Sequence, residues 1–141
     1  MSAQLSRLTV EEESLMMPLL IKILQKTDET KSLFGDRIVK FMNLKKDDIG
    51  FKASMSTTRL RKMINFIREH GILPVISGSN GYYISTDKNV ILEMIASLKS
   101  RRMAIEKAEY GLANMLRQLE TGNKGINEIL TKKIDTLWDM V

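Results

Sequence analysis

The 141-residue sequence has no cysteine and a single histidine, His70, and these shortages exclude several kinds of site. A chain without cysteine forms no disulfide, holds no thiolate-bound zinc and offers no thiol nucleophile. One histidine cannot build a multi-histidine metal centre or a conventional catalytic triad. The acidic clusters, Glu11 to Glu13 and Asp47-Asp48, consist of neighbouring carboxylates, which more often serve helix starts and loops than metal ions. We therefore expect a protein that is not an enzyme and that needs no metal or cofactor.

The sequence also lacks long hydrophobic runs. None approaches the roughly 20 apolar residues of a membrane-spanning helix. The N-terminal MSAQLSRLTVEEES has no apolar stretch of the kind found in signal peptides. Hydrophobic residues nevertheless make up 43% of the chain, which is the content of a folded protein rather than of a disordered tail. These features predict a cytoplasmic protein with one ordinary domain and an extension, and with no membrane partner.

Positive charge is concentrated in one part of the chain. Between Lys31 and Gly71, ten basic residues stand against four acidic ones, an excess of six, whereas the net charge of the whole chain is +5. Such a concentration is typical of a surface that neutralises nucleic-acid phosphates. The alternatives are a solvated face, or a face that meets an acidic protein.

Two helices are predicted before the middle of the chain. The first covers residues 9–25, because Thr9 and Glu12 have the spacing of a capping box and apolar residues follow at helical spacing. Pro18 predicts a kink or restart of this helix near Met17. The second helix covers Ser32 to Met42, with these apolar residues on one side: Leu33, Phe34, Ile38, Phe41 and Met42. The segment from Asn43 to Met55 is expected to be a loop.

The most informative segment runs from Ser56 to Ser85. Its first half predicts a helix that starts at Ser56 or Thr57 and ends at His70-Gly71. One side of that helix is apolar (Leu60, Met63, Ile64, Ile67) and the opposite side is polar (Thr58, Lys62, Asn65, Glu69). Two strands are expected next, Ile72 to Ser77 and Tyr82 to Ser85, joined by the tight turn Gly78-Ser79-Asn80-Gly81. The segment is therefore a basic amphipathic helix followed directly by a β-hairpin.

The polar groups of this segment predict contacts with duplex DNA. In the helix, the side chains of Thr58, Lys62 and Asn65 suit base edges, and Arg59 and Arg61 flank them within reach of phosphates. The hairpin offers small polar groups and backbone amides to phosphate oxygens. The predicted DNA-binding residues are Thr57, Thr58, Arg59, Arg61, Lys62, Asn65, Ser77, Ser79 and Asn80. A nucleotide-binding loop is a weaker interpretation of the glycines, because a strand rather than a helix follows them.

These residues also carry a family resemblance. A helix-loop-helix followed by STTRLRKMINFIREHG and ILPVISGSNGYYIS resembles the winged helix-turn-helix modules of bacteriophage, prophage and bacterial regulatory proteins. The resemblance covers residues 30–86, under half of the chain. It implies that the third helix lies in the major groove, and by position it carries this role to Thr58, Arg59, Arg61, Lys62 and Asn65. For a phage-encoded protein the expected location is the cytoplasm of the host cell.

The last third of the chain predicts a coiled coil. A long helix is expected from a cap at Asp87 to about Glu120, and a shorter one from about Asn127 that places Leu130, Ile134, Leu137 and Val141 at similar spacing. In the long helix, aliphatic residues recur every seven positions, and the predicted oligomerisation seam consists of Ile91, Met94, Leu98, Ile105, Leu112, Met115 and Leu119, with Arg101 as a charged interruption. The alternatives are packing against the preceding domain or a hairpin with the last helix.

The sequence thus predicts a mainly α-helical protein with a small β-hairpin. Residues 1–86 would form a winged helix-turn-helix DNA-binding domain, and residues 87–141 a helical region, a long coiled-coil-type helix and a short C-terminal helix, for oligomerisation or docking. The expected function is transcriptional regulation without catalysis, by a homodimer or small oligomer bound to duplex DNA. Two alternatives stay open. The first is a phage or mobile-element assembly protein, such as a DNA-packaging or replication-initiation subunit, and the second is a protein-binding inhibitor of a nucleic-acid enzyme.

Overall fold

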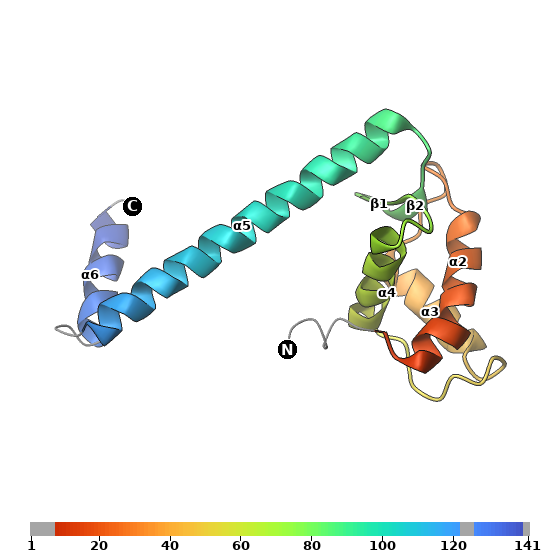
Figure 1. Ribbon diagram of the computed structural model, residues 1–141, viewed down its shortest axis with the longest axis horizontal. Helices are drawn as coiled ribbons and strands as arrows, with labels where there is room; N and C mark the ends of the chain where they lie inside the picture. Colours follow the sequence, from red (N-terminus) through yellow and green to blue (C-terminus); the bar gives the residue numbers. More distant parts are fainter. Residues whose placement is uncertain (1–7, 122–125, 140–141) are drawn as a thin grey trace. The chain divides into compact units, whose positions relative to one another are not determined.

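The computed structural model describes residues 8–121 and 126–139 and is mostly helical, with one small antiparallel sheet and a long helix (Figure 1). The chain divides into two compact units, an N-terminal unit (Met1–Ile95) and a C-terminal unit (Ala96–Val141). The N-terminal unit contains η1 (Glu12–Met16), α2 (Met17–Gln25), α3 (Gly35–Lys45), α4 (Thr57–Glu69), β1 (Val75–Gly78) and β2 (Gly81–Ile84). Helix α5 (Lys88–Glu120) begins in this unit and continues into the C-terminal one, where α6 (Ile126–Asp139) follows.

The first helical segment starts with the predicted capping box. The Thr9 amide donates to Glu12 Oε1 over 2.8 Å, and the Glu12 amide donates to Thr9 Oγ1 over 3.1 Å. The chain is wound as a π-helix in η1 and as an α-helix from Met17, with Pro18 in the first turn of α2. Because proline has no amide proton, this early position costs the new helix no hydrogen bond. The predicted restart near Met17 is confirmed.

The second helix, α3, starts later than predicted. It spans Gly35–Lys45 rather than Ser32 to Met42, because Leu33 is paired with β2 as an isolated bridge residue and cannot join a helix. Phe34 is the extended residue that caps α3, and Phe41 lines a surface groove of the same unit. Phe34 and Phe41, both expected on the apolar side, are 56% and 44% exposed.

The segment between α3 and α4 is a loop, as predicted, and Asn43 holds it in place. The Oδ1 atom of Asn43 accepts from the Met55 amide over 2.7 Å, and its Nδ2 donates to the Met55 carbonyl over 3.2 Å. Phe51 and Met55 are 1% and 4% exposed and belong to the core. The loop therefore contributes side chains to the interior instead of only spanning the surface.

Helix α4 forms as its sequence predicts. The Ser56 hydroxyl caps it by accepting from the Arg59 amide over 3.1 Å, and Gly71 closes it with a φ of 62°. Its predicted apolar side is buried at 0–1% exposure and consists of Leu60, Met63, Ile64 and Ile67. This side packs against α3 and β1, while α2 packs against α3 and β2 (Figure 1).

The hairpin is tied to the helices through Leu33. β1 and β2 pair antiparallel from Val75 opposite Ile84 to Gly78 opposite Gly81. The Leu33 amide donates to the Tyr82 carbonyl over 3.0 Å and its carbonyl accepts from the Tyr82 amide over 2.8 Å. This pairing brings the backbone so close that a Cβ on Gly81 would lie 2.2 Å from Leu33 O, and Gly81 has a φ of 110°. Only glycine fits there.

The first turns of α5 belong to the N-terminal unit. The Asp87 carboxylate accepts from the Asn89 amide over 2.9 Å, which confirms the predicted cap. Met94 is 7% exposed, and the Ser77 amide donates to its sulfur over 3.4 Å. The division between the units accordingly follows Ile95, later than the boundary expected after residue 86. Met94, expected in the oligomerisation seam, is a packing residue of the N-terminal unit instead.

In the C-terminal unit both helices expose large apolar side chains. On α5 the expected seam residues Leu98, Ile105 and Leu112 are exposed, and Met115 and Leu119 are half-buried. On α6 the exposed residues are Leu130, Ile134, Leu137 and Trp138. Val141, expected on the same side of the last helix, lies outside the described residues. Along the described helices, none has both the length and the apolar content that crossing a bilayer demands.

Candidate nucleic-acid interface

Helix α4 presents an exposed polar strip opposite its buried side. Thr57, Thr58, Arg61 and Asn65 are all exposed. At about 100° per residue, the directions of these four side chains fall within about 100° of one another. Within the described part of the chain, the Arg61 guanidinium has no hydrogen bond or ion pair, so it is available to a phosphate or a base edge.

Two other predicted contacts, Lys62 and Arg59, are held by an acidic side chain of the same domain. Lys62 Nζ lies 2.8 Å from Glu12 Oε1, and Arg59 Nε lies 3.5 Å from Glu12 Oε2. The Glu12 side chain is 0% exposed, whereas those of Lys62 and Arg59 are 23% and 31% exposed. The Arg59 guanidinium also sits 5.4 Å from the centre of the Phe51 ring. These two cations are therefore partly neutralised inside the fold, and Arg61 is the better placed of the predicted helix cations.

Glu12 is ionised despite its burial. Burial raises the pKa of Glu12, but hydrogen bonds from Lys62 and Thr9 and the nearby Lys62 charge outweigh it and leave the pKa below its ordinary value of 4.5. Oε2 receives no hydrogen bond from the described residues, and the Arg59 guanidinium is the positive group beside it. Lys62 and Arg59 therefore stabilise the ionised form of the buried Glu12 carboxylate.

The hairpin tip is exposed at Ser79 and Asn80, and its base is fixed by Arg68. Arg68 Nε donates to the Val75 carbonyl over 3.0 Å, and Arg68 Nη2 donates to Ser77 Oγ over 2.7 Å. The Ser77 hydroxyl, predicted to meet a phosphate, is therefore engaged within the domain. Since Arg68 is the last basic residue of α4, it fixes the hairpin to the same helix that carries the polar strip.

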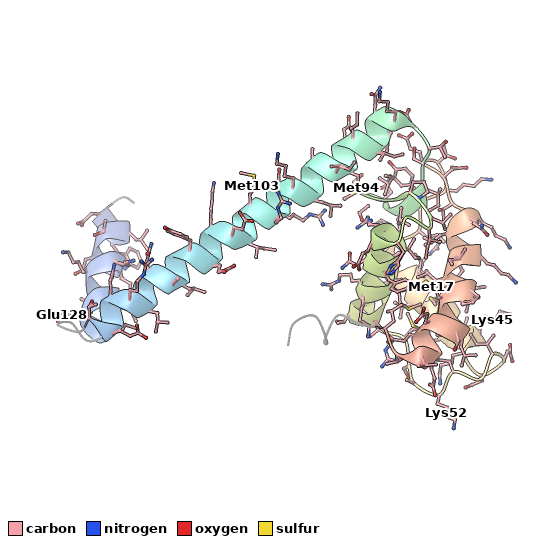
Figure 2. The ribbon with its side chains drawn as sticks, in the orientation of Figure 1. Met17, Lys45, Lys52, Met94, Met103 and Glu128 are labelled. Atoms are coloured by element: carbon pink, nitrogen blue, oxygen red, sulfur yellow. The ribbon has the colours of Figure 1, made fainter. Side chains whose placement is uncertain are left out.

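Other basic side chains of the charge-rich third extend into solvent. Lys45, at the end of α3, and Lys52, in the following loop, point away from the domain (Figure 2). They add positive charge to the N-terminal unit without forming part of the strip.

A second surface lies between α2 and α3. It is an apolar groove of about 580 Å³. Its apolar lining consists of Leu19, Ile23, Leu33, Ile38, Phe41 and Leu44, and its basic residues are Lys22, Lys26, Arg37 and Lys40. None of the described residues that line it is acidic, so the groove combines hydrophobic contact with a positive rim.

Two residues of the interface were missed from the sequence. The sequence pattern indicates only a capping role for Glu12, because its contact with Lys62 spans 50 positions and no local pattern reveals it. In the sequence, Arg68 stands out only as one more positive charge of the basic segment. Its place in the last turn of a helix directly before a hairpin was the available signal.

No group of three or more metal-ligating side chains occurs among the described residues. Comparison of the chain with protein-family models, with curated proteins and with solved structures finds no match.

Proposed function

We propose that the N-terminal unit is a winged helix-turn-helix module that binds duplex DNA. The polar strip of α4 would enter the major groove, with Thr58 and Asn65 at base edges, and Arg61 and the hairpin tip would meet the backbone. The observation that carries this proposal is the pairing of an exposed Thr57-Thr58-Arg61-Asn65 strip with a hairpin fixed to the same helix. The positive excess of the surrounding segment supports it.

The module would act as a transcriptional regulator. Two copies held together would read a palindromic site, with the half-site spacing set by the protein. The exposed apolar face of α5 supports a dimer. The molar mass separates this role from the assembly role, because a packaging or replication-initiation ring predicts many subunits where a regulator predicts two.

The replacement Arg61→Ala tests the DNA-binding role. We expect it to weaken duplex binding by about tenfold and to reduce the salt slope by about one, because one phosphate contact is lost. Fluorescence anisotropy over a salt series measures both quantities. The matched control is Lys22→Ala on α2, which removes the same charge from the same unit and should leave binding nearly unchanged. Equal affinities of the Arg61 variant and the unmodified chain would contradict the proposal.

The groove between α2 and α3 favours one rival function, an interaction protein whose partner is acidic. An amphipathic helix with acidic flanks suits an apolar floor and a rim of four cations. Absence of binding to any duplex at low salt would support this rival. In that case Arg37→Glu should abolish partner binding while Arg61→Ala leaves it intact.

A further inference from the structure

One face of α5 presents large aliphatic side chains to solvent in the C-terminal unit. Leu98, Ile105 and Leu112 recur every seven residues and are 37%, 67% and 72% exposed. A repeat of seven keeps one seam of a helix turned toward a second helix over many turns. The helix is 33 residues long, so the exposed seam is too extended to be a chance surface patch.

The second row of this seam lies four residues after the first. It starts at Ile95, continues with Arg102 and Glu109, and ends at Leu116, and its two aliphatic ends are 55% and 56% exposed. The sequence instead favours a second row that begins at Met94, three residues after Ile91. Met94 is not available for such a row, because it is buried in the N-terminal unit. The available seam therefore has aliphatic ends and two opposite charges in the middle of its second row.

Arg102 and Glu109 are free to pair outside their own helix. Arg102 Nε lies 4.0 Å from a Glu106 carboxylate oxygen, and both side chains are more than 60% exposed, at 68% and 67%. An exposed pair at that distance contributes little to stability. A second helix could offer Arg102 a better carboxylate.

We propose that two copies of the chain pair along this seam with their α5 helices antiparallel, so that Arg102 of each copy lies beside Glu109 of the other. In this register Leu98 of one copy faces Leu116 of the other, and Arg102 faces Leu112. Glu109 of the second copy lies about one helical turn from that Leu112. The long arginine side chain spans a turn of about 5.4 Å. Two-fold symmetry then forms this ion pair twice. The pairing supplies the dimer on which the proposed function rests.

A parallel pair in register has the opposite electrostatics. It sets Arg102 against Arg102 and Glu109 against Glu109, and like charges at inner positions oppose association. The flanking charges Arg101 and Glu106 favour the parallel pair slightly, but exposed flanking pairs contribute little. The inner charges therefore select the antiparallel orientation.

Because the chain has no cysteine, introduced cysteines report the orientation directly. Leu98→Cys and Leu116→Cys are made as separate full-length chains and oxidised alone or after mixing. In the antiparallel pair the two copies of residue 98 are 18 positions apart, about 27 Å along the axis. A disulfide needs Cα atoms about 6 Å apart. We expect cross-linked dimer only in the mixture. Cross-linking of each variant alone would overturn the proposal, as would a monomeric mass for the unmodified chain.

Charge reversal gives an independent test. Arg102→Glu or Glu109→Arg alone should raise the dimer dissociation constant by about tenfold. The double reversal should restore it to within about threefold, because the two signs are only exchanged. A parallel pair allows no such rescue, since like charges still face each other. Sedimentation equilibrium measures the constants without DNA, so failure here leaves the DNA-binding proposal untouched.

Discussion

Replacing Glu12 with glutamine removes one buried negative charge and keeps the shape of the side chain. The capping box tolerates the change, because glutamine suits the third helical position. The unmodified carboxylate is 2.8 Å from Lys62 Nζ and 3.5 Å from Arg59 Nε. Removing one partner of a wholly buried ion pair costs about 3–5 kcal/mol. Since Lys62 and Arg59 are partly exposed and can turn to water, we expect the free energy of unfolding at pH 7 to fall by about 2 kcal/mol.

The pH dependence sharpens this prediction. The pKa of Glu12 is lower in the folded chain than its ordinary value of 4.5, so the folded state favours the ionised form. Its stabilising contribution is present above pH 4.5 and is lost as the pH falls through the folded pKa. The unfolding free energies of the unmodified chain and of Glu12→Gln should therefore converge at acidic pH.

Urea unfolding from pH 3 to pH 7 measures both effects. The matched control is Glu13→Gln, which removes the same charge from the exposed neighbouring position and should cost less than about 0.5 kcal/mol. Equal stabilities and parallel pH profiles for the two variants would refute the reasoning. On the proposed function, Glu12→Gln should also bind duplex DNA more tightly, because Lys62 and Arg59 become available to phosphates.

Two further predictions concern the backbone. Asn43→Ala leaves the Met55 amide and carbonyl without their partner and should lower the free energy of unfolding by about 2 kcal/mol, with no loss for the exposed control Asn65→Ala. Gly81→Ala should lower it by more than about 4 kcal/mol, because the new Cβ meets Leu33 O. Gly50→Ala, which shares a positive φ but has open space, should cost about 1 kcal/mol. Thermal unfolding that ranks the two glycine variants equally would rule out the clash.

The parts of the fold that local patterns describe were predictable. Helix α4 has a serine cap, four apolar residues at helical spacing and a terminal glycine, and all of these signals lie within one short segment. The capping box of Thr9 and Glu12 and the cap that Asp87 provides for α5 are equally local. Each depends on hydrogen bonds between residues two or three positions apart.

What the sequence could not show depends on contacts between distant segments. Leu33 has the apolar character of a helix residue, and its pairing with Tyr82 appears only when the hairpin is folded against it. Lys62 and Arg59 look like free cations until the first helix brings Glu12 beside them. The exposed strip of α4 therefore offers fewer free cations than its sequence indicated, and Arg61 is the principal one.

The length of α5 has a consequence for the proposed antiparallel pair. With Leu98 facing Leu116 of the second copy, Ile95 faces residue 119, and the two copies of Ile95 are 24 positions apart, or about 36 Å along the axis. The length of the helix would thus set the interval between the two N-terminal ends of the seam. Deleting one heptad from the helix would shorten that interval by about 10 Å.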